Sequence, residues 1–379
     1  MSLAAPFSTH RFSASWQVLA GFVLASAALL ALPDIDGADG MAARRIVMAQ
    51  GFVMLGVIAA LLRGGTVAGF VGLGFGAFGA AFALLGALAA APAPMPLGYW
   101  AVAAAAWLLA WRLVADLSAL EPAAPAARRT LALLIPLLFG AWLLILWELV
   151  VRGAGVPQVL VPAPSAIALR IVTSADLLAV DFVQTFKAVL AGYLLGCGAG
   201  FLVALLCDRV DFLRRGLLPI GNLASALPIV GVAPIMVMWF GFDWPSKAAV
   251  VVVMTVFPML VNTVAGLNAA GSMERDLMRT YAATPGQSLL KLRLPAAMPF
   301  VFNALKINAT LALIGAIVAE FFGTPIVGMG FRISAEIGRM NTAMVWAEIT
   351  VAALVGSLSY GLLALAERRV TFWHPSMRR

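Results

Sequence analysis

Five polar side chains fall inside segments that are otherwise strongly apolar, which makes them the first candidates for chemistry in this chain. They are Asn262, Asn303, Lys306, Asn308 and Glu320. Polar groups at membrane depth are costly, and they usually face a partner or a water-filled pathway. We therefore expect these five residues to line a route for a polar solute.

Three of the five candidates have a second interpretation. Lys306 lies about one and a half turns into its segment, close enough to the end for its ammonium group to snorkel to the interface. Asn262 can instead hydrogen-bond between helices. Glu320 lies near the other end of its segment, where it can act as a gate or pair with Arg332.

The residues needed for enzymatic chemistry are missing from the sequence. Its only histidines are His10 and His374, and it has no HExxH motif, no CxxC motif and no paired intramembrane aspartates. It also lacks the GxxxxGK[ST] loop that cradles ATP phosphates. We therefore predict no catalytic residue, no metal site and no cofactor bound by this chain. If ATP drives its activity, a partner must bind the ATP and Mg.

A polar loop from about residue 271 to 295 is the most informative segment. Helix-forming residues dominate from Met273 to Tyr281, Pro285 and Gly286 interrupt them, and a second amphipathic stretch ends at Pro295. Two short helices joined by a bend suit a docking element. The alternative is a solvated interfacial loop without a partner, because charged stretches are often only solvated.

This loop resembles the cytoplasmic coupling motif of ABC importer permeases, Glu-Ala-Ala-x3-Gly-x9-Ile-x-Leu-Pro. With Leu294 and Pro295 as the anchor, Ala282 stands at the Gly position and Leu292 at the Ile position. A glycine there permits a tight turn, so Ala282 is a departure, and Gly286 is the alternative site for the bend. The resemblance implies that the following residues couple to an ATPase: Asp276, Leu277, Met278, Arg279, Ala282, Ala283, Gly286, Leu294 and Pro295.

Further stretches resemble the branch of these permeases that handles nitrate, sulfonates and taurine. They occur in the family's order: Val161–Ser165, Ala226–Ile235, Trp239–Phe242, Phe257–Pro258, Asn262–Thr263, Glu320 and Gly328–Phe331. The resemblance extends over residues 131–375. The first 120 residues have no counterpart in the usual six-helix member.

The resemblance implies a transmembrane permease subunit of an ATP-driven, binding-protein-dependent importer that works by alternating access. The partners implied are an ABC ATPase, a second permease copy in a homodimer, and a periplasmic or lipid-anchored solute-binding protein. The implied solute is a small organic or inorganic anion or a vitamin-precursor heterocycle. An ion-coupled secondary transporter or a membrane scaffold without transport activity is the alternative.

Composition indicates how these residues are positioned. The chain has 379 residues, of which 63% are hydrophobic and 11% charged, and its mean hydropathy is +1.00. It must therefore lie in a lipid bilayer. In such a chain the net charge of +8 reflects orientation by the positive-inside rule and indicates no nucleic-acid partner. We predict an all-α membrane protein with about ten transmembrane helices.

The expected spans follow the apolar windows of the sequence. They are residues 16–32, 46–62, 66–91, 98–116, 131–151, 183–206, 217–240, 247–267, 299–321 and 344–366. The Pro- and Arg-containing segment 121–130 is the predicted cytoplasmic linker. It separates an additional four-helix region, 1–120, from a six-helix type I ABC importer core, 131–379.

The distribution of basic residues predicts the orientation. With both termini in the cytoplasm, most of the 25 Lys and Arg residues lie on the inner side. The expected location is a bacterial inner membrane. Glycines spaced by four residues, Gly192, Gly196 and Gly200, predict close helix packing within the chain rather than a dimerisation face.

Overall fold

The computed structural model describes residues 15–28, 40–63, 65–91, 93–224, 228–323 and 326–373, in which every regular element is helical. The first six helices are α1 (Trp16–Ala28), α2 (Gly40–Arg63), α3 (Val67–Leu88), α4 (Leu97–Ser118), α5 (Pro125–Gly153) and α6 (Pro164–Thr173). The next five are α7 (Ala175–Arg209), α8 (Asp211–Ala224), α9 (Ile229–Phe240), α10 (Trp244–Leu267) and α11 (Ser272–Thr280). The rest are α12 (Pro285–Ser288), a π-helical turn (Leu289–Arg293), α13 (Leu294–Glu320), α14 (Met329–Gly338) and α15 (Thr342–Val370).

Eight helices within the described residues are long and apolar enough to cross a membrane. They cover Gly40–Leu62, Val67–Leu88, Leu97–Ser118, Pro125–Gly153, Ala175–Arg209, Trp244–Leu267, Pro285–Glu320 and Thr342–Val370. The fold is therefore the all-α membrane architecture that the sequence predicts.

One of the ten expected spans differs from the prediction within the described residues, and one is described only in part. In place of one helix over 217–240, the chain forms α8 and α9, both too short to cross the hydrocarbon region. Proline explains the break, because Pro228 caps α9 and has no N–H with which to continue a helix. The described part of the first span is α1, which has 13 residues, and residues 29–39 lie outside the described part of the chain.

The chain divides into two compact units, Met1–Ala166 and Ile167–Arg379. In the first, α5 packs on α3 and α4, and the hydroxyl of Tyr99 donates to the carbonyl of Leu149 at 3.2 Å. The boundary between the two compact units therefore lies after the predicted linker 121–130, because α5 buries Trp142 and Leu149 in the same core as α3 and α4.

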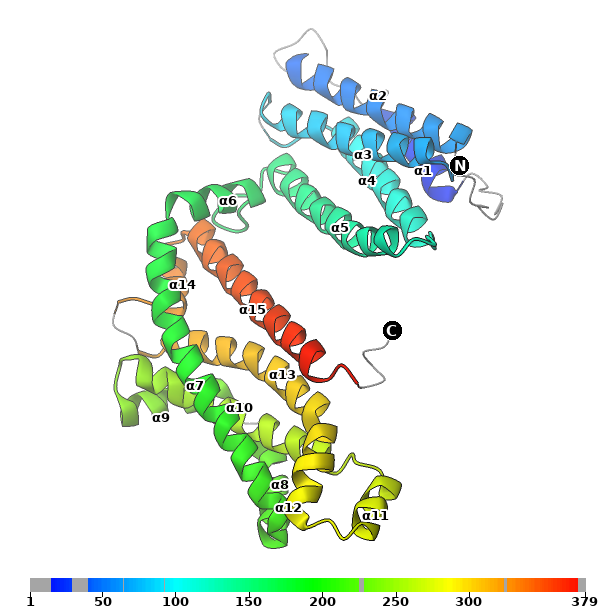
Figure 1. Cartoon of the computed structure of the whole chain (residues 1–379). Helices are drawn as coiled ribbons and strands as arrows, with labels where there is room; N and C mark the ends of the chain where they lie inside the picture. Colours follow the sequence, from blue (N-terminus) through cyan, green and yellow to red (C-terminus); the bar gives the residue numbers. More distant parts are fainter. Residues whose placement is uncertain are drawn as a thin grey trace. The chain divides into compact units, whose positions relative to one another are not determined.

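Close helix packing organises the second unit, in which α10 lies against both α7 and α13 (Figure 1). A side chain at Gly196 would place its Cβ 1.9 Å from Oγ1 of Thr255, and one at Gly200 would meet the carbonyl of Val256 at 2.4 Å. The predicted packing role of these glycines is confirmed: they let α7 and α10 approach within backbone contact.

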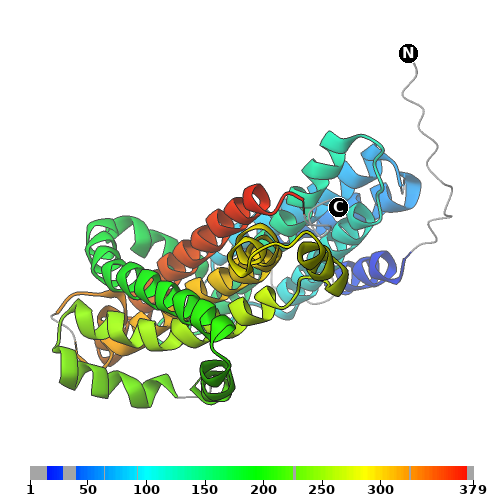
Figure 2. The ribbon, with the colours of Figure 1, turned by 60° about the horizontal axis from the view of Figure 1, so that its bottom comes forward.

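The two ends of the second unit carry different features. α11 and α12 lie at one end and α14 at the other (Figure 1), and Figure 2 brings the end with α11 forward. The long helices α7, α10, α13 and α15 run between them.

Candidate functional site

The polar loop predicted to couple to an ATPase begins with α11, which is exposed over most of its surface, with Arg275 and Met278 half-buried. None of its residues is buried, and Met273, Leu277 and Tyr281 present large apolar side chains to the surroundings. The spacing of four residues puts these three on one side of the helix. Asp276 and Arg279 form an exposed ion pair of 3.6 Å on the same helix. Exposed apolar groups beside charges are typical of a docking surface.

A left-handed residue ends this helix, and that residue is Ala282. Its φ is +49°, its N–H donates to the carbonyl of Arg279, and the N–H of Ala283 donates to the carbonyl of Met278. This is the Schellman pattern, which usually has glycine at the left-handed position. The bend is therefore at Ala282. The alternative at Gly286 is wrong, because Gly286 lies within α12 and has no positive φ.

We predict that Ala282→Gly stabilises the end of α11. A non-glycine residue in this conformation costs about 1–2 kcal/mol, which glycine removes in part. Ala282→Val should have the opposite effect, because a branched side chain is strained further there. Hydrogen exchange of the amides of Ala282 and Ala283 in the purified protein measures both changes. Equal protection in the two variants would contradict a left-handed turn at this position.

The second half of the loop is anchored by a cap and a wide, π-helical turn. Thr284 and Gln287 form a reciprocal capping box at the start of α12. The π-helical turn then leads into α13, where Leu294 and Pro295 occupy the first turn, a position that tolerates proline.

Two arginines tie this loop to the long helices. Both terminal nitrogens of Arg293 contact the carboxylate of Asp208 at the end of α7, one of them at 2.7 Å, and its Nε donates to the carbonyl of Leu267 on α10. Arg275 donates to the carbonyls of Asn268 and Ala270. The loop base is thereby fixed to α7 and α10.

Lys306 is paired within the core. Its Nζ lies 2.7 Å from a carboxylate oxygen of Glu367 on α15 and 5.8 Å from the ring centre of Tyr360. Together with Asn303, Lys306 and Tyr360 line a hollow of about 350 Å³. Lys306 and Asn303 give this hollow N–H donors, and Asn303 and Thr310 give it acceptor oxygens, so it offers a solute both kinds of group.

Asn308 and Asn262 make different contacts. Asn308 is fully buried, and its amide nitrogen donates to the carbonyl of Thr255 at 2.9 Å and contacts Sγ of Cys197 at 3.2 Å. It thus links α13 to α10 and α7. The amide nitrogen of Asn262 donates to the carbonyl of Pro258 within α10. Neither Asn262 nor Asn308 is among the residues that line the hollow beside Lys306.

A buried polar cluster fastens α14 to α7 and α13 at the end of the unit opposite to α11. Both carboxylate oxygens of Glu320 accept from the hydroxyl of Thr185, and Oε2 also accepts from the N–H of Gly330 at 2.7 Å. Nε of Arg332 lies 2.8 Å from Asp181, which is 0% exposed. The option that Arg332 pairs with Glu320 is therefore wrong, because Asp181 takes that place.

Two features strengthen this cluster. The hydrogen bond to Asp181 raises the pKa of Arg332 above its usual value, so the guanidinium stays charged. Asp181 also accepts from the N–H of Gly328 at 2.8 Å, and that residue has a φ of +133°. A side chain at Gly328 would be strained and would meet Glu320, which explains a glycine at this junction.

The structure thus brings most of the sequence candidates into three places: the exposed α11 turn, the hollow beside Lys306 and the cluster around Glu320. Asn262 and Asn308 lie apart from these, in contacts within α10 and between α13, α10 and α7. Sequence reasoning missed three acidic residues: Asp181, Asp208 and Glu367. They are the ion-pair partners of Arg332, Arg293 and Lys306, respectively. Each is a carboxylate within a long apolar helix, and that signal could have identified it. His10, His374 and residues 226–227 lie outside the described part of the chain.

The stretch Val161–Ser165, which the resemblance places on an outer loop, is anchored within the first unit. Both the N–H and the hydroxyl of Ser165 donate to the carboxylate of Glu148 on α5, at 2.9 and 2.7 Å. Arg152, one turn further along α5, pairs with the same carboxylate at 3.1 Å. These bonds fix the loop that leads into α6.

Known proteins resemble this chain over its second part. Residues 192–372 match the family described as the inner membrane component of binding-protein-dependent transport systems. A probable ABC transporter permease protein of Haemophilus influenzae is 32% identical over 228 residues, covering 60% of this chain and 93% of the relative. The formylaminopyrimidine transport permease of Halalkalibacterium halodurans is 30% identical over 247 residues, covering 65% and 98%. A putative aliphatic sulfonates transport permease of Bacillus subtilis is 29% identical over 244 residues, covering 63% and 87%.

Proposed function

The chain belongs to the permease family of binding-protein-dependent ABC transport systems, and from this premise we propose how its parts divide the work of import. Two copies form the pathway, and a separate ATPase docks on α11 of each copy. A solute-binding protein delivers the solute at the opposite end. Both termini then face the cytoplasm of a bacterial cell, and ATP and Mg are bound by the ATPase alone.

The exposed apolar side of α11 is the observation that carries this proposal. Met273, Leu277 and Tyr281 form a short apolar strip on a charged helix, at the end of the unit opposite to α14 (Figure 2). A helix of this kind binds by laying its apolar side in a groove of the partner. The clamps of Arg275 and Arg293 then pass its movement to α7 and α10.

The proposed solute is small and polar. The relatives are named for formylaminopyrimidine and aliphatic sulfonates, which are a heterocycle and a group of organic anions. The hollow beside Lys306 and Asn303 supports a polar solute, since its donors suit an anionic group or a ring acceptor. Asn308 and Glu320 support this pathway by holding the helices around it, whereas the bond of Asn262 lies within α10.

Docking is tested by purifying the permease with its cognate ATPase. We expect Leu277→Asp to reduce recovery of the ATPase by about tenfold or more, because a charge in an apolar contact is costly and tenfold corresponds to about 1.4 kcal/mol. Asp276→Lys should weaken the complex as well. Asp176→Lys, at an exposed position at the start of α7, is the matched control. Unchanged recovery in both α11 variants would overturn the docking assignment.

A further inference from the structure

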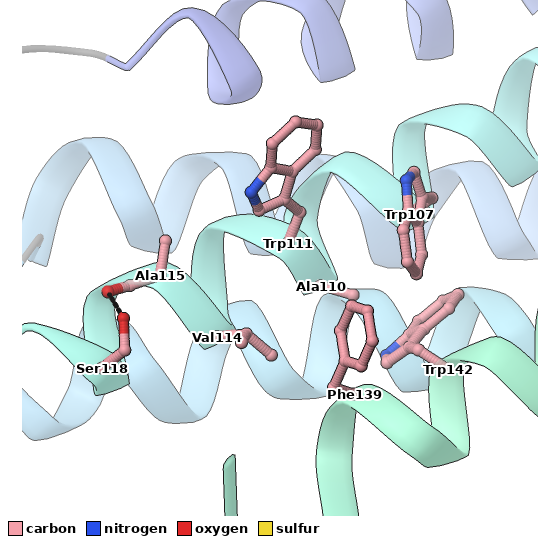
Figure 3. A pocket seen from close by; sticks show the side chains of 8 residues that line it. All are labelled: Trp107, Ala110, Trp111, Val114, Ala115, Ser118, Phe139 and Trp142. Carbon is pink, nitrogen blue, oxygen red and sulfur yellow. Dashed lines mark hydrogen bonds between the residues drawn. The ribbon is translucent and has the colours of Figure 1, made fainter. Parts of the chain in front are cut away.

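The first unit contains a hollow lined mainly by aromatic rings, which the import mechanism does not use. It has a volume of about 500 Å³ and lies between the second half of α4 and the middle of α5 (Figure 3). Trp107 and Trp111 enter it from α4, and Phe139 and Trp142 from α5. Both helices are membrane spans, so a ligand would reach this hollow from the bilayer.

The walls of the hollow form a closed back and an open front. Trp142 is 1% exposed and packs against Trp107, with ring centres 6.1 Å apart, and against Phe78 at 5.5 Å. Trp111 and Phe139 are each 47% exposed. The buried rings are held by their neighbours. Trp111 packs with Trp16 at 5.6 Å and Phe139 with Trp107 at 6.4 Å, and the exposed remainder of these two rings is available to a planar ligand.

The polar groups of the hollow restrict the ligand further. The indole Nε1 of Trp142 is buried and has no hydrogen-bond partner among the residues that the structure describes, which is uncommon for a buried donor. In Figure 3 this nitrogen lies on the edge of the ring nearest to Phe139. Within the described part of the chain no charged residue lines the hollow, and the nearby Arg112 is paired with Asp116 at 2.8 Å. A suitable ligand is therefore neutral and carries an acceptor.

We propose that this hollow binds a neutral, lipid-soluble molecule with a planar ring and a carbonyl oxygen, the chemical class of quinones. The ring stacks on Trp111 and Phe139, and the carbonyl accepts the free N–H of Trp142. A fused two-ring compound is much smaller than the hollow. A lipid acyl chain fits less well, because it has no acceptor for the indole and no flat face for the rings.

Two probes of equal shape test the proposal on the full-length chain in detergent. Menadione is a neutral naphthoquinone, and 2-methylnaphthalene has the same ring system without the carbonyls. Equilibrium dialysis should show one saturable site per chain that binds menadione about fivefold more tightly, since a neutral hydrogen bond contributes about 0.5–1.5 kcal/mol. In Trp142→Phe this preference for menadione should vanish, because phenylalanine retains an aromatic ring but has no N–H donor.

A filling variant and a control complete the experiment. Val114→Trp projects a large ring into the hollow and should reduce the binding of both probes by about tenfold or more. Trp100→Phe should leave the affinities for both probes unchanged, because Trp100 does not line the hollow and its N–H donates to the carbonyl of Met95. Non-saturable partitioning of both probes, or a menadione preference that persists in Trp142→Phe, would overturn the proposal.

Discussion

Arg332→Ala is expected to destabilise the core of the second unit by about 3–5 kcal/mol, the usual cost of leaving one partner of a buried ion pair without the other. Asp181 has no exposure, and its carboxylate accepts Nε of Arg332 at 2.8 Å and the N–H of Gly328 at 2.8 Å. Without the guanidinium, a charged group stays buried beside Glu320. The start of α14 should then detach from α7.

The measurement is thermal unfolding of the purified variants in detergent, combined with solute uptake. Arg339→Ala is the matched control on the same helix, because Arg339 is largely exposed and its pair with Glu336 should contribute at most about 1 kcal/mol. Adding Asp181→Asn to Arg332→Ala should recover part of the lost stability by removing the unpaired charge. If Arg332→Ala and Arg339→Ala unfold at the same temperature, and adding Asp181→Asn to Arg332→Ala does not raise that temperature, the pair of Arg332 and Asp181 does not hold α14.

Much of this architecture follows from local patterns in the sequence. Long apolar windows predict the helices, because backbone groups in lipid must be paired within the segment. The glycines of α7 predict a close helix contact, since only small residues permit that approach, and the helix in contact is α10. The pattern from Asp276 to Pro295 predicts two short helices joined by a bend, and α11 and α12 have that form, while the docking role of this segment stays a prediction.

The missed features depend on contacts between distant parts of the chain. Lys306 is 61 positions from Glu367, and Arg332 is 151 positions from Asp181. No local spacing relates such residues, so the sequence identifies costly charges without identifying their partners. The bend illustrates the same limit on a smaller scale: glycine preference favours Gly286, but the Schellman bonds place it at Ala282.

Arg293→Ala is expected to separate ATP hydrolysis from transport, lowering the uptake per ATP hydrolysed by about tenfold or more. Arg293 binds Asp208 with two nitrogens and the carbonyl of Leu267 with a third, so it joins the loop to both α7 and α10. Hydrogen bonds to charged groups contribute about 1.5–3 kcal/mol, which corresponds to a factor of about 10–150. Since α11 itself is unchanged, the ATPase should still dock.

Uptake and ATP hydrolysis in proteoliposomes, measured together, test this expectation, and Lys291→Ala is the control because Lys291 is an exposed cation in the same turn. Arg293→Lys should retain only part of the coupling, because lysine keeps the charge but loses the planar fork that contacts both oxygens. A merely structural arginine would lower ATPase recovery and uptake in parallel. If Arg293 transmits movement, ATPase recovery should stay constant while solute uptake falls. In the proposed arrangement docking depends on α11, whereas transmission depends on the bonds of Arg293 to α7 and α10.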